Sequence, residues 1–189
     1  MAPQLRSSGR ILLGLGANCP GPWGTPPETF ARALEELGRR GVAIEAVSDL
    51  YETAALGSAR QATYFNAVAL VRTRLSAEAL LRLLKEIEAR AGRRGGRPWG
   101  SRTLDLDILD YKGLVLNWRT RKVGQPLPGY RPLVLPHAEL ERRPFVLGPL
   151  LDVAPDWRHP VTRKSARALW RAASKHGQGR VLARTGWPR

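Results

Sequence analysis

The sequence predicts an α+β fold in which an antiparallel sheet carries two helices on one face, the ferredoxin-like β-α-β-β-α-β sandwich, followed by a C-terminal extension. Three observations predict it. Several segments alternate apolar and polar residues with the period of a strand, two segments have the apolar period of a helix, and their connections are short. The second face of the sheet is expected to stay open for a ligand.

The first strand and the first helix are expected within residues 11–37. Residues 11–16 form a short apolar run that ends in small residues, which predicts a buried strand followed by a loop. A helix should begin after Thr25, because Thr25 can cap it, two prolines occupy its first turn, and Glu28 is placed for a capping box. Its apolar stripe consists of Phe30, Leu34 and Leu37.

Two further strands are predicted over residues 42–53 and 64–71, where apolar residues recur at alternate positions. In the second of them Tyr64 and Asn66 point to the same face, so an aromatic ring and an amide lie side by side. This pair either contacts a ligand or is an ordinary strand-end aromatic beside a turn-forming Asn. The pattern alone leaves both interpretations open.

A second helix is predicted from the cap at Ser76 to Gly92. Its apolar residues form one stripe along the helix: Leu80, Leu83, Leu84, Ile87 and Ala91. Glu88 lies on this helix and is expected to be solvated, although it could reach the loop that follows.

Residues 102–111 carry the strongest functional signal. Leu104, Leu106 and Ile108 alternate with Asp105 and Asp107, which predicts a strand with both carboxylates on one face, roughly 6 to 7 Å apart. Such a pair can hold one or two Mg²⁺ ions against a polyphosphate. The alternative is an ordinary strand with a solvated polar face, but a Gly- and Arg-rich loop over residues 92–97 precedes the pair and favours a metal-bound anion.

The remainder of the chain is basic. A long segment over residues 117–132 has no predicted element, and a last amphipathic helix is expected at about residues 165–175, with Ala166, Leu169, Trp170 and Ala173 on one stripe. We expect a single domain over residues 1–189, with a core from about residue 10 to 160 and a basic helix and tail from about 161 to 189.

Charge and cysteine content limit the class of protein. The net charge is +15, but nine Lys or Arg and no acid lie in residues 157–189, so residues 1–156 carry only 22 basic against 16 acidic side chains. This moderate excess fits an acidic small molecule as ligand. The sequence lacks an apolar run of membrane-spanning length, and its single Cys19 predicts a reducing, cytoplasmic location.

Read together, these features resemble the 6-hydroxymethyl-7,8-dihydropterin pyrophosphokinase family of folate biosynthesis. The resemblance covers residues 12 to about 160, and the family's W-G-P-R-T-L-D-L-D-I is matched over residues 99–108 at every position except Ser101. Other matching residues occur in the same order along the chain: Tyr51, Thr53, Leu56, Gly57, Gln61, Tyr64, Asn66, Ile87, Glu88, Arg93, Pro136, His137, Arg143 and Phe145.

The resemblance implies transfer of pyrophosphate from ATP to the hydroxymethyl group of the pterin, with release of AMP. It implies that Asp105 and Asp107 bind two Mg²⁺ ions and that Arg93 and Arg102 act with them in catalysis. The remaining implied roles fall into two groups: ATP binding by Glu88, Arg93, Trp99, Arg102, Ile108, His137 and Arg143, and pterin binding by Thr53, Leu56, Tyr64, Asn66, Trp99 and Phe145. Trp99 is expected on a loop that closes over the substrates, and the protein is expected to be a monomer, with a dimer left open.

Besides Ser101, the chain departs from the family pattern at further positions, and two alternatives accompany this interpretation. Ala54 and Ala55 stand where the family has prolines, and Ala138 stands where Tyr is common. An RNA-recognition module would have the same element order, but residues 11–15 lack the aromatics that such modules use. A catalytically inactive scaffold is the other alternative, and the presence of both aspartates and the flanking arginines speaks against it.

Overall fold

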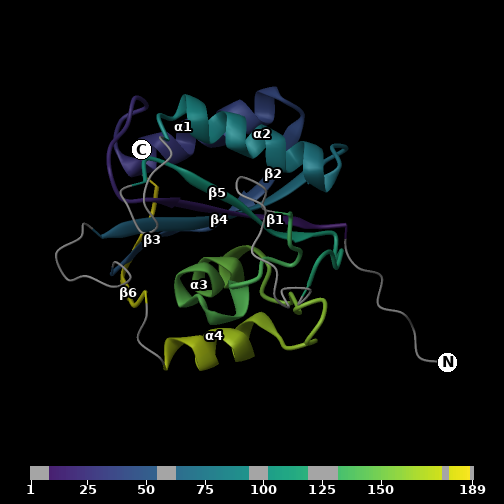
Figure 1. Ribbon diagram of the computed structural model, residues 1–189. Helices are drawn as coiled ribbons and strands as arrows, with labels where there is room; N and C mark the ends of the chain where they lie inside the picture. The colour runs from purple at the N-terminus through teal and green to yellow at the C-terminus, as the bar shows by residue number, and fades with distance from the viewer. Residues whose placement is uncertain (1–8, 55–62, 94–101, 119–131, 176–178, 188–189) are drawn as a thin grey trace.

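The computed structural model describes residues 9–54, 63–93, 102–118, 132–175 and 179–187. Its centre is an antiparallel sheet in the order β5-β1-β4-β3-β6, with β2 also paired to β4 (Figure 1). The strands run as follows: β1 Ile11–Ala17, β2 Val42–Val47, β3 Leu50–Thr53, β4 Tyr64–Thr73, β5 Asp105–Tyr111 and β6 Val181–Thr185.

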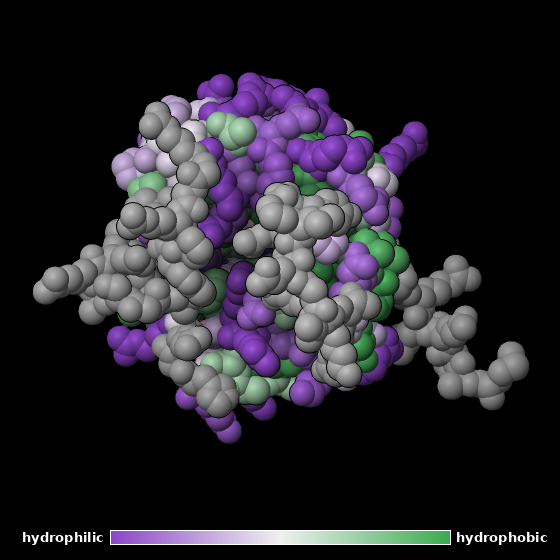
Figure 2. Space-filling view, viewed as in Figure 1, coloured by the Kyte–Doolittle hydropathy of each residue, from purple (hydrophilic) through white to green (hydrophobic). Residues whose placement is uncertain are grey.

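Helices α1 (Pro26–Arg39) and α2 (Ala77–Arg90) lie together on one face of the sheet (Figure 1). Both predicted caps are confirmed. Glu28 accepts hydrogen bonds from the amide and the hydroxyl of Thr25, both at 2.7 Å, and the Ser76 hydroxyl accepts from the Ala79 amide at 3.2 Å. The outer surface of this layer is mainly hydrophilic (Figure 2). The helices therefore begin where the sequence predicts and turn their apolar stripes inward.

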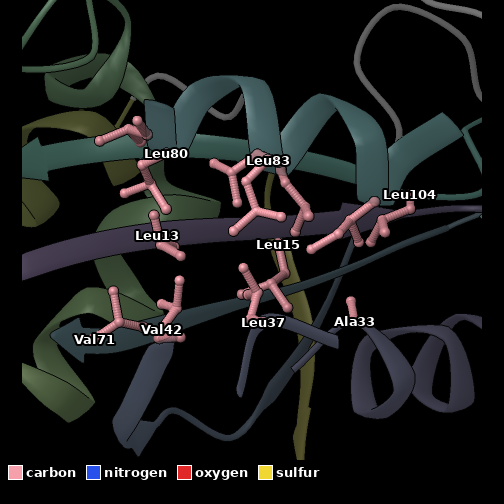
Figure 3. Packing of buried hydrophobic residues seen from close by; sticks show 14 of the residues in the cluster. Leu13, Leu15, Ala33, Leu37, Val42, Val71, Leu80, Leu83 and Leu104 are labelled. Atoms are coloured by element: carbon pink, nitrogen blue, oxygen red, sulfur yellow. The ribbon is translucent and has the colours of Figure 1, made fainter. Parts of the chain in front are cut away.

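A first hydrophobic core fills the space between this helical layer and the sheet. Leu13 and Leu15 of β1 pack beneath Leu80 and Leu83 of α2, with Leu104 beside them (Figure 3). All are buried. Burial of such side chains is worth about 1.5–3 kcal/mol each, so this core is a principal source of stability.

A second hydrophobic core lies on the opposite face of the sheet. It is covered by α3 (Pro144–Val153), the 3-10 helix η1 (Leu140–Arg142) and α4 (Ala166–Ser174) (Figure 1). The ferredoxin-like class is confirmed, but the expectation that the second face is open is wrong wherever α3 packs on it. Since RNA-recognition modules read RNA on that open face, the added layer also argues against the RNA-binding alternative.

The predicted 165–175 helix is confirmed as α4, with one difference. Leu169 and Ala173 are buried, whereas Trp170 is 36% exposed and lies at the margin of the packed stripe. The helix α3 was not predicted. It carries apolar residues on all sides and contains Pro149, so its sequence has no amphipathic period to detect.

The segment predicted as one strand over residues 42–53 is two strands, β2 and β3, that both pair with β4. At the break, the Ser48 side chain accepts the Val68 amide at 3.0 Å, in addition to the backbone bond from the Ser48 amide to the Val68 carbonyl at 2.9 Å. The strand β6 was also not predicted and pairs with β3. No helix in the described part of the chain is long and apolar enough to cross a membrane.

Leu169→Ala is expected to lower the free energy of unfolding by about 2–5 kcal/mol, because it opens a cavity in the second core. Denaturant unfolding at constant pH measures this change. Leu114→Ala is the matched control: its side chain is 42% exposed, and we expect a change within about 0.5 kcal/mol. Equal effects of the two variants would show that α4 does not stabilise the fold.

Candidate active site

A pocket opens on the second face of the sheet, between the strands and the start of α3. Fifteen residues line it: Gly14, Leu15, Gly16, Thr53, Ala54, Tyr64, Asn66, Ala67, Arg102, Asp105, Asp107, Leu109, Arg143, Phe145 and Val146. Eight of them are predicted site residues, and they come from four separate stretches of the chain. The fold thus brings the two carboxylates, two arginines and two aromatic rings to one place.

The two aspartates reach the pocket because β5 alternates between two environments. Leu106 and Ile108 point into the first core, whereas the side chains of Asp105 and Asp107 line the pocket and are 23% and 34% exposed. Each carboxylate therefore remains accessible to a ligand. The side chain of Ile108, predicted to contact ATP, points away from the pocket.

Two arginines hold Asp105. Arg93 Nη1 donates to Asp105 Oδ1 at 2.6 Å, and Arg102 Nη1 pairs with Asp105 Oδ2. Burial acts to raise the pKa of Asp105, but the neighbouring charges of Arg93 and Arg102 outweigh it and the pKa lies below 3.8. Asp105 is therefore an anion already engaged by the groups expected to bind phosphate.

Glu88 anchors this arrangement from behind. It is 2% exposed, accepts from Lys85 Nζ at 2.8 Å and from the Leu106 amide at 2.7 Å, and forms an ion pair with Arg93. The expectation of a solvated Glu88 is wrong, because β5 is an edge strand and the Leu106 amide needs an acceptor from outside the sheet. Glu88 does not line the pocket, and Arg93 links it to Asp105, which does.

Asn18 positions Arg102 and was not predicted. Its amide donates to the Arg102 carbonyl at 2.9 Å, and its side-chain Oδ1 accepts the Arg102 amide at 2.7 Å. This pair of bonds ties the segment before β5 to the end of β1. The sequence feature that could have indicated this role is a polar residue directly after a buried strand. The sequence alone predicts only a loop there.

His137 lies beside Asp107, with 3.8 Å between Nε2 and Asp107 Oδ2. Its Nδ1 accepts the Glu139 amide at 3.2 Å, so the proton of the neutral ring is on Nε2, towards Asp107. Burial lowers the pKa of His137 and Arg143 lowers it further, while Asp107 partly opposes them. His137 is thus a neutral hydrogen-bond donor at neutral pH.

The other half of the pocket combines aromatic and amide groups. Asn66, which is buried, donates from Nδ2 to Thr53 Oγ1 at 2.8 Å. Tyr64 comes from β4 and Phe145 from the first turn of α3, so two aromatic rings line the pocket from different elements. Burial raises the pKa of Tyr64, which keeps the phenol neutral. This half suits a flat heterocycle with a polar edge.

Two predicted site residues, Leu56 and Trp99, lie outside the described residues. The pocket residues that sequence reasoning missed are small or apolar: Gly14, Leu15, Gly16, Ala67, Leu109 and Val146. Such residues carry no chemical signal in a sequence. Only the sheet order and the packing of α3 show that they face the same pocket.

The donor set fits Mg²⁺ bound together with a polyphosphate. Among the residues that the structure describes, no cluster of three or more His, Cys, Asp or Glu could hold a metal ion. Mg²⁺ usually takes one or two carboxylates and completes its shell with phosphate oxygens and water. Asp105 and Asp107 on one accessible face meet that requirement.

Comparison with known proteins points to one family. A sequence model of 7,8-dihydro-6-hydroxymethylpterin-pyrophosphokinase (HPPK) matches residues 12–155. The chain is 34% identical over 154 residues to 2-amino-4-hydroxy-6-hydroxymethyldihydropteridine pyrophosphokinase of Aquifex aeolicus, and 38% identical over 155 residues to that of Pseudomonas aeruginosa. Each alignment covers 82% of this chain and 86% of the relative.

Solved structures show the same fold. Wild-type Plasmodium falciparum HPPK-DHPS, crystallised with SDX-DHP, superposes with a TM-score of 0.64 at 15% identity. The superposition covers 88% of this chain and 44% of that one, so this chain spans less than half of the two-part protein.

The acid stability of the protein is expected to depend on Asp105. Its pKa is lower in the folded protein than the value of 3.8 taken for the unfolded chain. Asp105 therefore stabilises the fold above pH 3.8, and this contribution is lost as the pH falls through the lowered pKa. In urea denaturation, Asp105→Asn should flatten the decline of the free energy of unfolding between about pH 4 and pH 2.

Asp110→Asn provides a contrast of opposite sign. Burial raises the pKa of Asp110, so its stabilising contribution is present below 3.8 and is lost as the pH rises through the raised pKa. Removal of the Asp110 carboxyl group should therefore steepen the decline of the free energy of unfolding as the pH falls. An Asp105→Asn profile parallel to wild type would contradict the role of the two arginines.

Proposed function

The chain belongs to the 7,8-dihydro-6-hydroxymethylpterin-pyrophosphokinase family, and from that premise we propose how the pocket performs the family's reaction. The protein transfers pyrophosphate from ATP to the hydroxymethyl group of 6-hydroxymethyl-7,8-dihydropterin in folate synthesis. The assignment of individual residues is our proposal. The observation that carries it is the joint position of Asp105 and Asp107 on one pocket face, between arginines and aromatic rings.

In this proposal Asp105 and Asp107 would hold Mg²⁺, two ions in all, together with the triphosphate of ATP. When bound, Mg²⁺ neutralises phosphate charge and lowers the pKa of the attacking hydroxyl group. His137 Nε2 lies 3.8 Å from Asp107 Oδ2, with its N–H directed towards that carboxylate. We propose that the same N–H contacts ATP once the nucleotide is bound.

The arginines stabilise the phosphate charge. Arg102 and Arg143 line the pocket, and Arg93 reaches Asp105 from its edge. A guanidinium group can donate to a carboxylate and to phosphate oxygens at once, so Arg93 and Arg102 can engage the triphosphate while still near Asp105. Pyrophosphate transfer proceeds through a loose transition state with charge on the phosphate oxygens, so fixed positive groups supply much of the rate.

The pterin occupies the aromatic half of the pocket. Tyr64 and Phe145 stack on the bicyclic ring, and Asn66 with Thr53 reads its hydrogen-bonding edge. Asn66 retains its side-chain carbonyl for the ligand, because its Nδ2 is committed to Thr53. The hydroxymethyl group would then point towards the aspartates.

Several expectations stay predictions. They concern the number of metal ions, the monomeric state, the cytoplasmic location, and the ligand contacts of Leu56, Trp99, Glu88 and Ile108.

The protein is expected to release AMP from ATP only when both Mg²⁺ and 6-hydroxymethyl-7,8-dihydropterin are present. A coupled AMP assay with each component omitted in turn measures this. AMP formation at the same rate without the pterin would contradict a pyrophosphate transfer to it.

Asp105→Asn and Asp107→Asn should each lower kcat by about 10³-fold or more, because several kcal/mol of charge stabilisation are lost. Glu45→Gln is the control: Glu45 is a partly exposed carboxylate on β2, paired with Arg72 away from the pocket, and its variant should keep wild-type activity. Circular dichroism checks that each variant is folded. Near-normal turnover in either folded aspartate variant would overturn the proposed metal site.

A further inference from the structure

The last described segment of the chain, residues 179–187, lies beyond the matched family span of residues 12–155 and nevertheless reaches the pocket. It contains β6, which runs beside β3 at the edge of the sheet (Figure 1). We call residues 179–187 the C-terminal clasp. It contacts the pterin half of the pocket at two separate walls.

The first wall is the end of β3. Val181 pairs with Thr53, and the Ala54 amide donates to the Arg180 carbonyl at 3.0 Å. Thr53 and Ala54 both line the pocket. The clasp therefore fixes the backbone at Ala54. The family is expected to have a proline at this position, and its ring would restrict φ. Alanine lacks that restriction.

The second wall is the ring of Phe145, which packs directly on Gly179. A Cβ atom added to Gly179 would stand 2.8 Å from Cε1 of Phe145 and closer still to Cδ1. Gly179 also has a φ of +64°, which favours glycine. The ring can occupy its place in the pocket only because this position carries no side chain.

The rest of the clasp is anchored away from the pocket. Arg184 donates to Asp49 at 2.7 Å, pairs with Asp152 at 3.3 Å, and lies over the ring of Tyr51. Trp187 donates from Nε1 to the Ser48 carbonyl at 2.8 Å. Single exposed ion pairs are weak, but together these contacts fix the C-terminal end of β6 against β3 and α3.

We propose that Gly179 is a positioning residue for pterin binding: the C-terminal clasp holds the Phe145 ring and the end of β3 in the geometry that the pterin requires. This inference rests on the proposed stacking of Phe145 on the pterin. It assigns a role in substrate affinity to a part of the chain that the family match does not include.

Gly179→Ala tests the proposal. The dissociation constant for 6-hydroxymethyl-7,8-dihydropterin, measured by calorimetry with Mg²⁺ and saturating α,β-methylene-ATP, should rise about tenfold, the scale of one lost aromatic contact. The dissociation constant for α,β-methylene-ATP itself should change by less than about twofold. A purely structural role would weaken both ligands equally, and that outcome would overturn the proposal.

Two glycines provide matched controls. Gly41 has a φ of +80° and no heavy atom within 4 Å of an added Cβ, so Gly41→Ala introduces the backbone strain without the clash. Gly186 has neither feature, so Gly186→Ala tests a methyl group within the clasp itself. Both variants should bind the pterin as wild type does. A tenfold loss in Gly41→Ala would show that strain and not the Phe145 contact is being measured.

Phe145→Ala separates failure of this inference from failure of the proposed site. If Phe145→Ala binds the pterin as wild type does, the stacking role of Phe145 is wrong. If Phe145→Ala weakens binding and Gly179→Ala does not, only the role of the clasp is wrong. In the double variant, Gly179→Ala should add little to Phe145→Ala, and a full additive loss would contradict coupling between the two residues.

If Gly179→Ala does not fold, a double variant that combines Phe145→Leu with Gly179→Ala is tested instead. The smaller side chain relieves the clash, so this double variant should recover the cooperative unfolding transition. Continued failure to fold would overturn the proposed contact.

Discussion

The antiparallel pairing of β5 with β1 is the constraint on which the site depends. It places Asp107 opposite Gly14 and Asp105 opposite Gly16, so no side chain of β1 competes with the carboxylates at these positions. The same register sends Leu106 and Ile108 into the first core. A shift by one residue would exchange the two faces, burying Asp105 and Asp107 and exposing Leu106 and Ile108. Hydrophobic packing thus enforces the orientation of the charged groups.

A second constraint is that each buried or half-buried charge of the site has a partner within the protein itself. Asp105 is neutralised by Arg93 and Arg102, Arg93 is shared with Glu88, and Glu88 is in turn held by Lys85 and a strand amide. Buried charges of this kind are tolerated because each has an opposite charge or a hydrogen-bond partner. Under the proposed function, polyphosphate binding would exchange these partners for phosphate oxygens at groups that are already in place.

The sequence predicted the parts of this protein that have a periodic or a chemical signature. Alternation predicted β5 and its two aspartates, and cap residues predicted the starts of α1 and α2. The failures have physical causes. Helix α3 is apolar on all sides and lacks a period, and β6 lies in a basic tail with no clear alternation. The partners of Glu88 and Asn18 depend on contacts between distant segments, and the small residues lining the pocket have no chemistry to recognise.

The hydrogen bond from the Leu106 amide to Glu88 has a consequence beyond the active site. β5 forms an outer margin of the sheet, where free amides invite the backbone of another molecule to add a strand and begin aggregation. A carboxylate from α2 already occupies that donor, and Lys85 covers the neighbouring Leu106 carbonyl at 3.2 Å. Glu88 therefore shields this margin of the sheet from self-association and also holds Arg93, the arginine that we propose to bind phosphate.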